Sequence, residues 1–298
     1  MKPQLKRIQT SQLDLAYLDV GDPKGKPVVL LHGWPDDPTT WNEVSAELTN
    51  RGCRAFIPYL RGFGPTRFLT SGSSKSGQLV ALGQDMIELT ERLGLERFVL
   101  VGHDWGARAA YILAALHPER VQGLLTLSVG YGTNDPRQKM AYAQVRSYWY
   151  HWFFATSRGK AALESDRREL CRFLWRTWSP TWHFADKEFE ETATSWENPD
   201  WTDVTLHSYR HRWGYAEGDP KYRELEERMA QLPQIRVPTI LIQGTEDGCN
   251  LPETSAGKDH FFTAGYRYVL VKAGHFIQRE DPQSVIGAVL ELLSTDRA

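Results

Sequence analysis

Residues 99–107 read VLVGHDWGA, an apolar run that passes at once into a turn with glycine on both sides of an Asp. The apolar run is typical of a buried strand, and the residues after Gly106 are typical of a helix. Gly102 and Gly106 let the strand and the helix approach closely across a tight turn. The stretch therefore predicts a strand, a sharp turn and a helix, with Asp104 at the tip of the turn.

This pattern has the form of a nucleophile elbow, G-x-Nuc-x-G, with Asp where Ser is more common. A carboxylate at the nucleophile position can attack carbon directly and form an ester. The alternative is that Asp104 merely caps the following helix. A cap, however, requires neither flanking glycines nor matching partners further along the chain.

Two such partners follow, the acid first and the histidine last. Asp247 comes after the apolar run 239–243 in the letters GTED, and His275 comes after the run 266–271 in AGHF. Both therefore stand at the carboxyl ends of expected parallel strands, where open α/β sheets bind ligands. We expect His275 to act as the base and Asp247 to orient it, with Glu246 as the alternative acid.

A fourth element lies at residues 30–35, where the letters LLHGWP lead from a buried strand into a loop of turn residues. The backbone N–H groups of Trp34 and Trp105 are expected to point at the oxygen that becomes negative when water attacks an ester. His32 and Gly33 begin this loop and are expected near the substrate. For these two residues, a strand-ending turn without a chemical role is the alternative.

The rest of the chain alternates short β-branched runs with helical patterns, as in a parallel sheet with crossover helices. The expected strands are 28–31, 54–58, 98–101, 124–129, 238–242 and 266–271. From about 136 to 228 the β-branched runs vanish, and eight of the eleven tryptophans lie there. We therefore predict an α/β core at 1–135 and 229–298 and an inserted helical lid, or cap domain, at 136–228.

The composition limits the partners of the protein. Lys and Arg total 35 against 37 Asp and Glu, and no one-signed block would draw the chain to nucleic acid or an anionic membrane. Cys53, Cys171 and Cys249 are odd in number and lack a C-x-x-C pair, so neither a disulfide framework nor a zinc site is expected.

The sequence shows no apolar leader in residues 1–10 and no stretch long enough to span a bilayer. We expect a cytoplasmic monomer or homodimer that binds no metal or organic cofactor. Its expected partners are a small organic substrate and water.

Four motifs carry a resemblance: HGWP at 32–35, RGFG at 61–64, GHDWG at 102–106 and GHFIQ at 274–278. They resemble those of the soluble epoxide hydrolases and their dehalogenase relatives within the α/β-hydrolase superfamily, and the resemblance covers nearly the whole chain. It implies an α/β-hydrolase fold, with a mostly parallel central sheet flanked by helices, and Asp104 as a covalent nucleophile. The lid alone separates the members of this group.

Epoxide hydrolases of this kind use two lid tyrosines, whose hydroxyls bond the epoxide oxygen and protonate it as the ring opens. Tyr150, in YWYHWFF at 148–154, matches the first, and Tyr209, in SYR at 208–210, matches the second. The resemblance thus implies an enzyme that opens a small or medium, mostly apolar epoxide to a vicinal diol. Packing within an aromatic lid is the alternative role for either tyrosine.

The lid also resembles that of fluoroacetate dehalogenases, in which a His-Trp pair and a Tyr hold the departing fluoride. His151, Trp152 and Tyr209 would fill those places, and Arg108 matches one of the two arginines that bind the substrate carboxylate. The other arginine follows the nucleophile in that family, where this chain has Trp105. A bidentate grip on a small carboxylate is then lost.

Haloalkane dehalogenases commonly hold halide with the Trp after the nucleophile and an Asn after His-Gly. Trp34 stands in the place of that Asn, so the halide cradle is incomplete. A non-catalytic ligand receptor on the same fold is a third reading, against which the complete set of Asp104, His275 and Asp247 argues. An esterase is disfavoured too, because Asp104 attacking an acyl carbon would give an anhydride.

Overall fold

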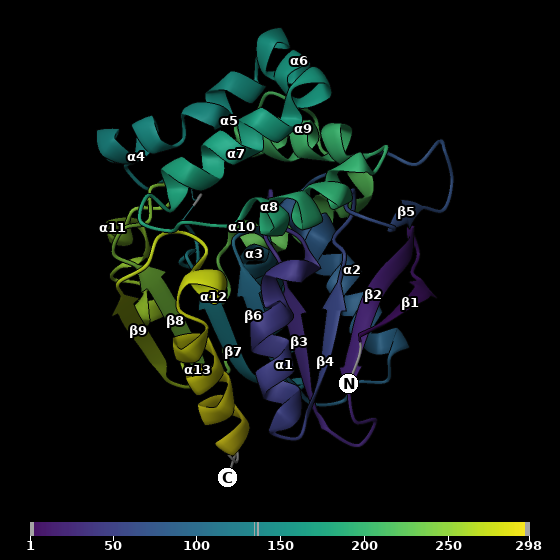
Figure 1. Cartoon of the computed structure of the whole chain (residues 1–298), viewed down its shortest axis with the longest axis vertical. Coiled ribbons are helices and arrows are strands. Elements are labelled where there is room, and N and C mark those ends of the chain that lie inside the picture. The colour runs from purple at the N-terminus through teal and green to yellow at the C-terminus, as the bar shows by residue number, and fades with distance from the viewer. Residues whose placement is uncertain (1–2, 134, 136, 296–298) are drawn as a thin grey trace.

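The computed structural model describes residues 3–133, 135 and 137–295, and the expected boundary residue Pro136 lies outside this part (Figure 1). One mostly parallel sheet forms the centre of the described chain. Its order is β1-β2-β4-β3-β6-β7-β8-β9, and β5 pairs with β2. The strands are β1 (Gln4–Gln9), β2 (Leu13–Gly21), β3 (Lys26–Leu31), β4 (Cys53–Pro58), β5 (Arg67–Phe68), β6 (Phe98–His103), β7 (Val121–Leu127), β8 (Thr239–Gly244) and β9 (Tyr266–Val271).

The predicted strands are confirmed, with small shifts at their ends. Strand β7, for example, begins at Val121 and ends at Leu127, where 124–129 was expected. The sequence analysis missed β1, β2 and β5, which pair antiparallel at one end of the sheet. Strand β1 is largely exposed and carries Lys6 and Arg7, a common way to protect a sheet edge, so it lacks the apolar signal of a buried strand.

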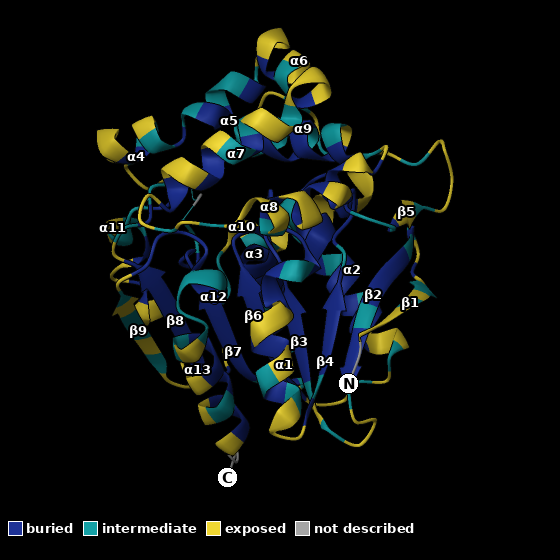
Figure 2. Cartoon of the chain, in the orientation of Figure 1, coloured by how far each residue is buried: buried dark blue, intermediate teal, exposed yellow. Residues whose placement is uncertain are grey.

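Helices cover both faces of the sheet because successive strand residues point to opposite sides. Val29, Leu31 and Leu100 pack toward α2 (Leu79–Arg92) and α3 (Trp105–Leu116). Their neighbours Val28 and Leu30 pack toward α1 (Asn42–Asn50) and α13 (Pro282–Ser294). Figure 2 shows the central strands buried along their length, as expected of a parallel sheet enclosed by two helical layers.

Between β7 and β8, the regular elements of the described residues are all helical. They are α4 (Tyr142–Ser147), α5 (Trp149–Phe154), α6 (Ser157–Ser165), α7 (Arg167–Trp178), α8 (Asp186–Ala193), η2 (Thr194–Glu197), α9 (Trp201–Arg212), η3 (Pro220–Tyr222) and α10 (Arg223–Ala230). Most of these helices lie together beyond one end of the strands (Figure 1). We propose that residues 136–228 form a cap domain over a core of 1–135 and 229–298. No helix in the described ranges is long and apolar enough to cross a membrane.

An ion-pair network joins helix α8 of the proposed cap to the loop after β3. Arg279, on α12 (Ile277–Glu280), bonds Asp36 in the loop after β3 at 2.6 Å and Glu188 on α8 at 2.8 Å. The side chain of Asp36 is fully buried. Burial alone would raise the pKa of Asp36, but the charge and hydrogen bonds of Arg279 hold it below its usual value.

We predict that Arg279→Ala lowers the free energy of unfolding by about 3 to 5 kcal/mol, because it leaves the Asp36 carboxylate buried without its partner. Arg267→Ala is the matched control, since Arg267 and Glu291 form an exposed pair that should contribute less than about 1 kcal/mol. Urea denaturation measures both values. Equal losses in the two variants would contradict the prediction.

Candidate active site

Asp104 stands on a strained turn between β6 and α3, as the elbow motif predicts. Its φ of 48° and ψ of −111° lie in a region that L-residues rarely adopt. A Cβ on Gly106 would come within 2.4 Å of the Leu31 carbonyl oxygen, and one on Gly33 within 2.5 Å of the Asp104 Cβ. The Asp104 side chain accepts no cap hydrogen bond from α3. The turn therefore presents the carboxylate to the site, and helix capping does not explain it.

The two oxygens of the Asp104 carboxylate have different surroundings. Oδ1 accepts a hydrogen bond from the backbone N–H of Trp34 at 3.0 Å. Oδ2 lies 4.0 Å from Nε2 of His275, which is too long for a hydrogen bond. Nε2 of His275 is buried and has no hydrogen-bond partner within the described part of the chain. This nitrogen is available to take a proton from a water molecule close to Asp104.

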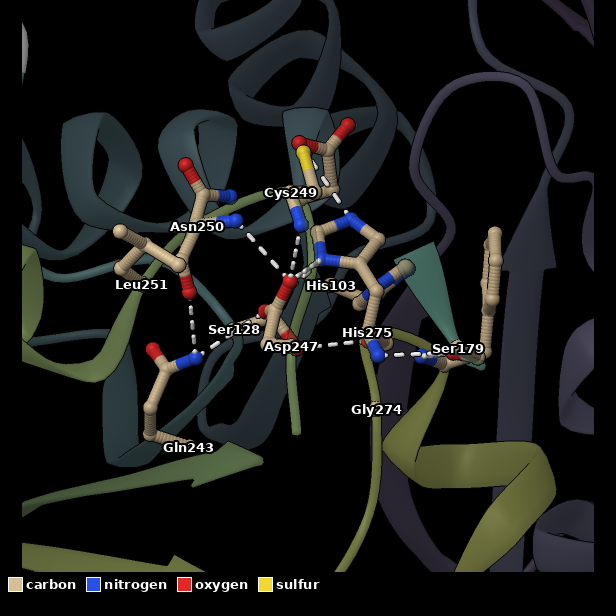
Figure 3. A network of polar contacts seen from close by, with 12 residues as sticks. His103, Ser128, Ser179, Gln243, Asp247, Cys249, Asn250, Leu251, Gly274 and His275 are labelled. Carbon is tan, nitrogen blue, oxygen red and sulfur yellow. Dashed lines mark hydrogen bonds and ion pairs between the residues drawn. The ribbon is translucent and has the colours of Figure 1, made fainter. Parts of the chain in front are cut away.

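The other ring nitrogen of His275, Nδ1, lies 3.1 and 3.0 Å from the two oxygens of Asp247 (Figure 3). Backbone N–H groups of Cys249 and Asn250 donate to Oδ1 of Asp247, and the Gln243 amide donates to Oδ2. These bonds fix the orientation of the carboxylate and, through it, of the His275 ring. The alternative acid Glu246 instead accepts a hydrogen bond from Thr181, so the geometry favours Asp247.

Three residues that sequence reasoning missed hold the backbone of His275. Its carbonyl accepts hydrogen bonds from the Ser128 hydroxyl at 2.6 Å and from Nε2 of His103 at 2.9 Å, while its N–H donates to the Ser179 hydroxyl at 2.8 Å. Burial, together with the nearby His275, lowers the pKa of His103 to about 3. His103 is therefore a neutral donor. Of the three residues, only His103 has a signal in the sequence, which is its position next to Asp104.

The charges around His275 favour its protonated form. Burial by itself would lower its pKa, but the charge and hydrogen bond of Asp247, followed by the charge of Asp104, raise it above its ordinary value. Loss of the Asp104 charge, as on formation of an ester, removes one of the raising effects. His275 then becomes neutral more readily, which is the state that a general base requires.

Tyr150 on α5 and Tyr209 on α9 lie together over the elbow. Their ring centroids are 5.3 Å apart, and both rings pack on Trp34, at 5.9 and 5.2 Å. The Tyr209 ring also packs on Trp105 at 5.6 Å, and the Tyr150 hydroxyl lies 3.4 Å from Sγ of Cys249. Burial raises the pKa of both tyrosines well above its usual value, and the charge of Asp104 adds to this effect. Both hydroxyls therefore keep their protons at neutral pH and are available as hydrogen-bond donors.

Both nitrogens of the His32 ring form hydrogen bonds with backbone groups, one in its own loop and one in the loop after β4. Its Nδ1–H donates to the carbonyl of Gly33 at 2.9 Å, and its Nε2 accepts from the N–H of Leu60 at 3.1 Å. Burial lowers the pKa of His32 to about 4, so the ring stays neutral. The bonds of this ring support the loop that carries Trp34, and substrate contact by His32 stays a prediction.

His151 and Trp152, the pair expected to hold a halide, both form hydrogen bonds with other residues. The Trp152 indole N–H donates to the carbonyl of Val145 at 3.2 Å, which removes it from a fluoride cradle in this conformation. Nδ1 of His151 accepts from the indole N–H of Trp213 at 3.0 Å, so its proton is on Nε2. That Nε2 is buried and has no hydrogen-bond partner among the described residues. His151 alone of the pair keeps a free donor.

Asp247, Cys249 and His275 bring three potential metal-ligand atoms within 4.8 Å of one another. Two of these three residues, Asp247 and His275, are however hydrogen-bonded to each other. Burial raises the pKa of Cys249 well above its usual value, so its thiol stays protonated and is a poor ligand. The set fits an oriented base better than a metal centre.

With this geometry established, comparison with known proteins identifies the family. The profile of the alpha/beta hydrolase fold family matches residues 26–282. The chain belongs to the α/β-hydrolase family. The match spans Asp104, Asp247 and His275, and it confirms the predicted fold class and the expectation of a hydrolytic enzyme.

The names of two relatives give two different activities. This hydrolase is 27% identical to epoxide hydrolase A of Mycobacterium tuberculosis, over 98% of each chain. It is 26% identical to fluoroacetate dehalogenase of a Burkholderia species, over 94% of each chain. A solved structure from Klebsiella pneumoniae, described provisionally as an epoxide hydrolase, matches with a TM-score of 0.91 and 36% identity over 97% of each chain.

We predict that Asp104→Asn lowers the pKa of His275, because the variant removes a negative charge that raises it. NMR titration of the ring protons in the wild-type hydrolase and the variant measures the change. Glu246→Gln is the control and should leave the His275 pKa in place, since Glu246 is bonded to Thr181. An unchanged or higher pKa in Asp104→Asn would show that the two groups are not coupled as the geometry indicates.

Proposed function

We propose that this hydrolase opens epoxides to vicinal diols through a covalent ester of Asp104. The observation that carries the proposal is the packing of Tyr150 and Tyr209 on Trp34, the residue whose N–H bonds the Asp104 carboxylate. It joins a carboxylate nucleophile to two phenols that can act as acids. The names of the mycobacterial and Klebsiella relatives support the same reaction.

In the first step, Oδ2 of Asp104 attacks a ring carbon of the epoxide. A carbon–oxygen bond forms to the carboxylate, and the ring carbon–oxygen bond breaks toward the oxygen. That oxygen takes a proton from Tyr150 or Tyr209, and the other hydroxyl donates a hydrogen bond to it. Oδ1 already accepts a hydrogen bond from the backbone N–H of Trp34. Oδ2 is therefore the oxygen that is free to attack.

In the second step, Nε2 of His275 takes a proton from water as the water oxygen attacks the carbonyl carbon of the ester. The carbonyl oxygen becomes negative, and the N–H groups of Trp34 and Trp105 stabilise it. Collapse breaks the bond between this carbon and the diol oxygen, which takes the second water proton from the new Asp104 carboxyl. The protonated His275 returns its proton to the tyrosine that gave one up in the first step. Asp104 is regenerated with one oxygen from water, while Asp247 stabilises the charged ring of His275.

The groups of this scheme are all amino-acid side chains and backbone, and its partners are an organic epoxide and water. Aromatic rings surround the reacting groups, among them Trp34, Trp105 and Phe154. Such rings favour an apolar body around the epoxide. We propose a small or medium epoxide as substrate.

Dehalogenation by the same Asp104 ester is the second candidate, and one observation favours it. Nε2 of His151 is buried and lacks a hydrogen-bond partner within the described ranges, so it could donate to a leaving halide. The Trp105 side chain instead interacts with the Tyr209 hydroxyl. The bond from Trp152 to Val145 counts against a complete fluoride cradle. A halide needs only hydrogen-bond donors to leave, whereas an epoxide oxygen needs a proton.

We predict that Tyr150→Phe and Tyr209→Phe each slow the opening of 1,2-epoxyhexane by about 10 to 1000-fold, the usual size of a general-acid effect. The double variant should be nearly inactive, because no phenol then remains to protonate the oxygen. Tyr142→Phe, which alters an exposed cap tyrosine, is the control and should leave the rate unchanged. Steady-state kinetics of diol formation measure the effect.

The same variants separate the two candidate reactions when they are assayed for halide release from fluoroacetate and 1-chlorobutane. Epoxide opening that survives in the Tyr150→Phe and Tyr209→Phe double variant would exclude the phenols as acids. If the wild-type protein releases halide faster than it forms diol, and His151→Ala abolishes that release, dehalogenation is the better assignment.

A further inference from the structure

Residues 247–251, the acid loop, follow β8 and hold the carboxylate that orients the proposed base. The backbone N–H groups of Cys249 and Asn250 donate to Oδ1 of Asp247 at 2.8 and 2.9 Å. The two oxygens of Asp247 lie 3.1 and 3.0 Å from Nδ1 of His275. The direction of the His275 ring therefore depends on how firmly the backbone of the acid loop is held.

A glutamine of the proposed cap, Gln144 on α4, grips this backbone at two points. Its side-chain N–H donates to the carbonyl of Cys249 at 2.7 Å, and its side-chain oxygen accepts from the N–H of Leu251 at 2.8 Å. The partners lie 105 and 107 residues further along the chain. Gln144 is only 1% exposed, so water does not compete for these two bonds.

The first of these bonds acts on the same peptide group that reaches the acid. The carbonyl of Cys249 and the N–H of Asn250 are the two ends of one planar unit. A rotation that carries this carbonyl away from Gln144 also turns the N–H away from Asp247. A chain of hydrogen bonds thus runs from Gln144 through the peptide group to Asp247 and on to His275. Each bond in such a chain polarises the next one.

The next peptide group is held from both sides, once by the core and once by the proposed cap. Its carbonyl, that of Asn250, accepts from the side chain of Gln243 on β8 at 3.0 Å, and its N–H, that of Leu251, donates to Gln144. Gln243 also donates to Oδ2 of Asp247 at 3.0 Å. The two glutamines therefore act on different oxygens of the acid, Gln243 directly on Oδ2 and Gln144 through the backbone on Oδ1.

Two tyrosines from the same stretch of the proposed cap contact the side chains of the acid loop. The Tyr148 hydroxyl donates to Oδ1 of Asn250, and the Tyr150 hydroxyl lies 3.4 Å from Sγ of Cys249. Tyr150 is also one of the proposed acids of the first step. The segment that carries this acid thus touches the loop that supports the base.

We propose that Gln144 is a positioning residue, which acts through the acid loop to hold Asp247 toward His275 during ester hydrolysis. This inference rests on the proposed ester mechanism and gives a role in it to a side chain outside the reacting groups. Ester formation uses Asp104 and the phenols, whereas ester hydrolysis uses the base and the acid that orients it. Loss of Gln144 therefore slows the second step and leaves the first step unchanged.

The test uses Gln144→Met, which keeps the length of the side chain and removes both hydrogen bonds. With 1,2-epoxyhexane as substrate, the Asp104 ester should form at the wild-type rate and be hydrolysed about 5 to 100-fold more slowly, as expected for the loss of one or two hydrogen bonds. Rapid-quench mass spectrometry of the peptide that contains Asp104 measures both rates. The ester should accumulate during turnover in this variant.

Asn198→Leu is the matched control, because Asn198 is another buried amide of the proposed cap that binds core backbone. Its side-chain N–H groups donate to the carbonyls of Gly64 at 3.0 Å and Thr66 at 2.7 Å. This variant also loses two bonds from cap to core, but neither of them reaches the acid loop. It should hydrolyse the ester at the wild-type rate. Urea denaturation compares the stability of the two variants.

A second measurement needs no turnover and follows the proton between Nδ1 of His275 and Asp247. Such a proton gives a downfield signal in the proton NMR spectrum, and His275→Gln assigns the signal by its loss. Exchange of this proton with water should be about 5 to 100-fold faster in Gln144→Met than in the wild-type protein, because the carboxylate that holds it is less firmly oriented. Asn198→Leu should keep the wild-type exchange rate.

The outcomes separate the two proposals. If the wild-type protein forms no Asp104 ester while proton exchange is faster in Gln144→Met alone, the positioning role stands and the proposed reaction fails. If the ester is hydrolysed at the same rate in Gln144→Met and the wild-type protein, or if Asn198→Leu slows it as much, the positioning role is overturned and the ester mechanism stands. Equal slowing of both steps in Gln144→Met would also overturn the positioning role, since the defect would then be general.

Discussion

The close approach of the loop after β3 to the turn at Asp104 is the constraint on which the site depends. A Cβ on Gly33 would lie 2.5 Å from that of Asp104, so this position has room only for glycine. The approach brings the Trp34 N–H within 3.0 Å of the carboxylate. It also compensates for an Asp104 backbone conformation that is costly for an L-residue. A single packed turn thus fixes the proposed nucleophile Asp104 together with the N–H of Trp34, which we propose as a donor to the oxyanion.

The arrangement of charge follows from this turn. Asp104 and Asp247 are both buried, and His275 lies between them with one ring nitrogen toward each. Both carboxylate oxygens of Asp247 accept hydrogen bonds. The Asp104 oxygen that faces His275 instead lies 4.0 Å from Nε2 of that ring. We propose that this difference in environment gives the two carboxylates different roles, in which Asp247 orients the base and Asp104 reacts.

Much of this site could be predicted from the sequence because its key features are local. The pattern around Asp104 contains the strand, the turn and the glycines within nine letters, and Asp247 and His275 each follow a recognisable apolar strand. Ser128 and Ser179 could not be predicted, since their bonds to His275 span 147 and 96 residues of chain. Strand β1 was missed because its exposed edge carries no buried pattern.

The central claim is that Asp104, and not water, attacks the substrate carbon. It is tested most directly by a single turnover in heavy-oxygen water with enzyme in excess over an epoxide. The account predicts an almost unlabelled diol and heavy oxygen in the peptide that contains Asp104, because water attacks the ester carbonyl. Over many turnovers the product should gain label from the exchanged carboxylate. A first-turnover diol that carries the solvent oxygen, with Asp104 unlabelled, would show that water attacks directly and would contradict the covalent mechanism.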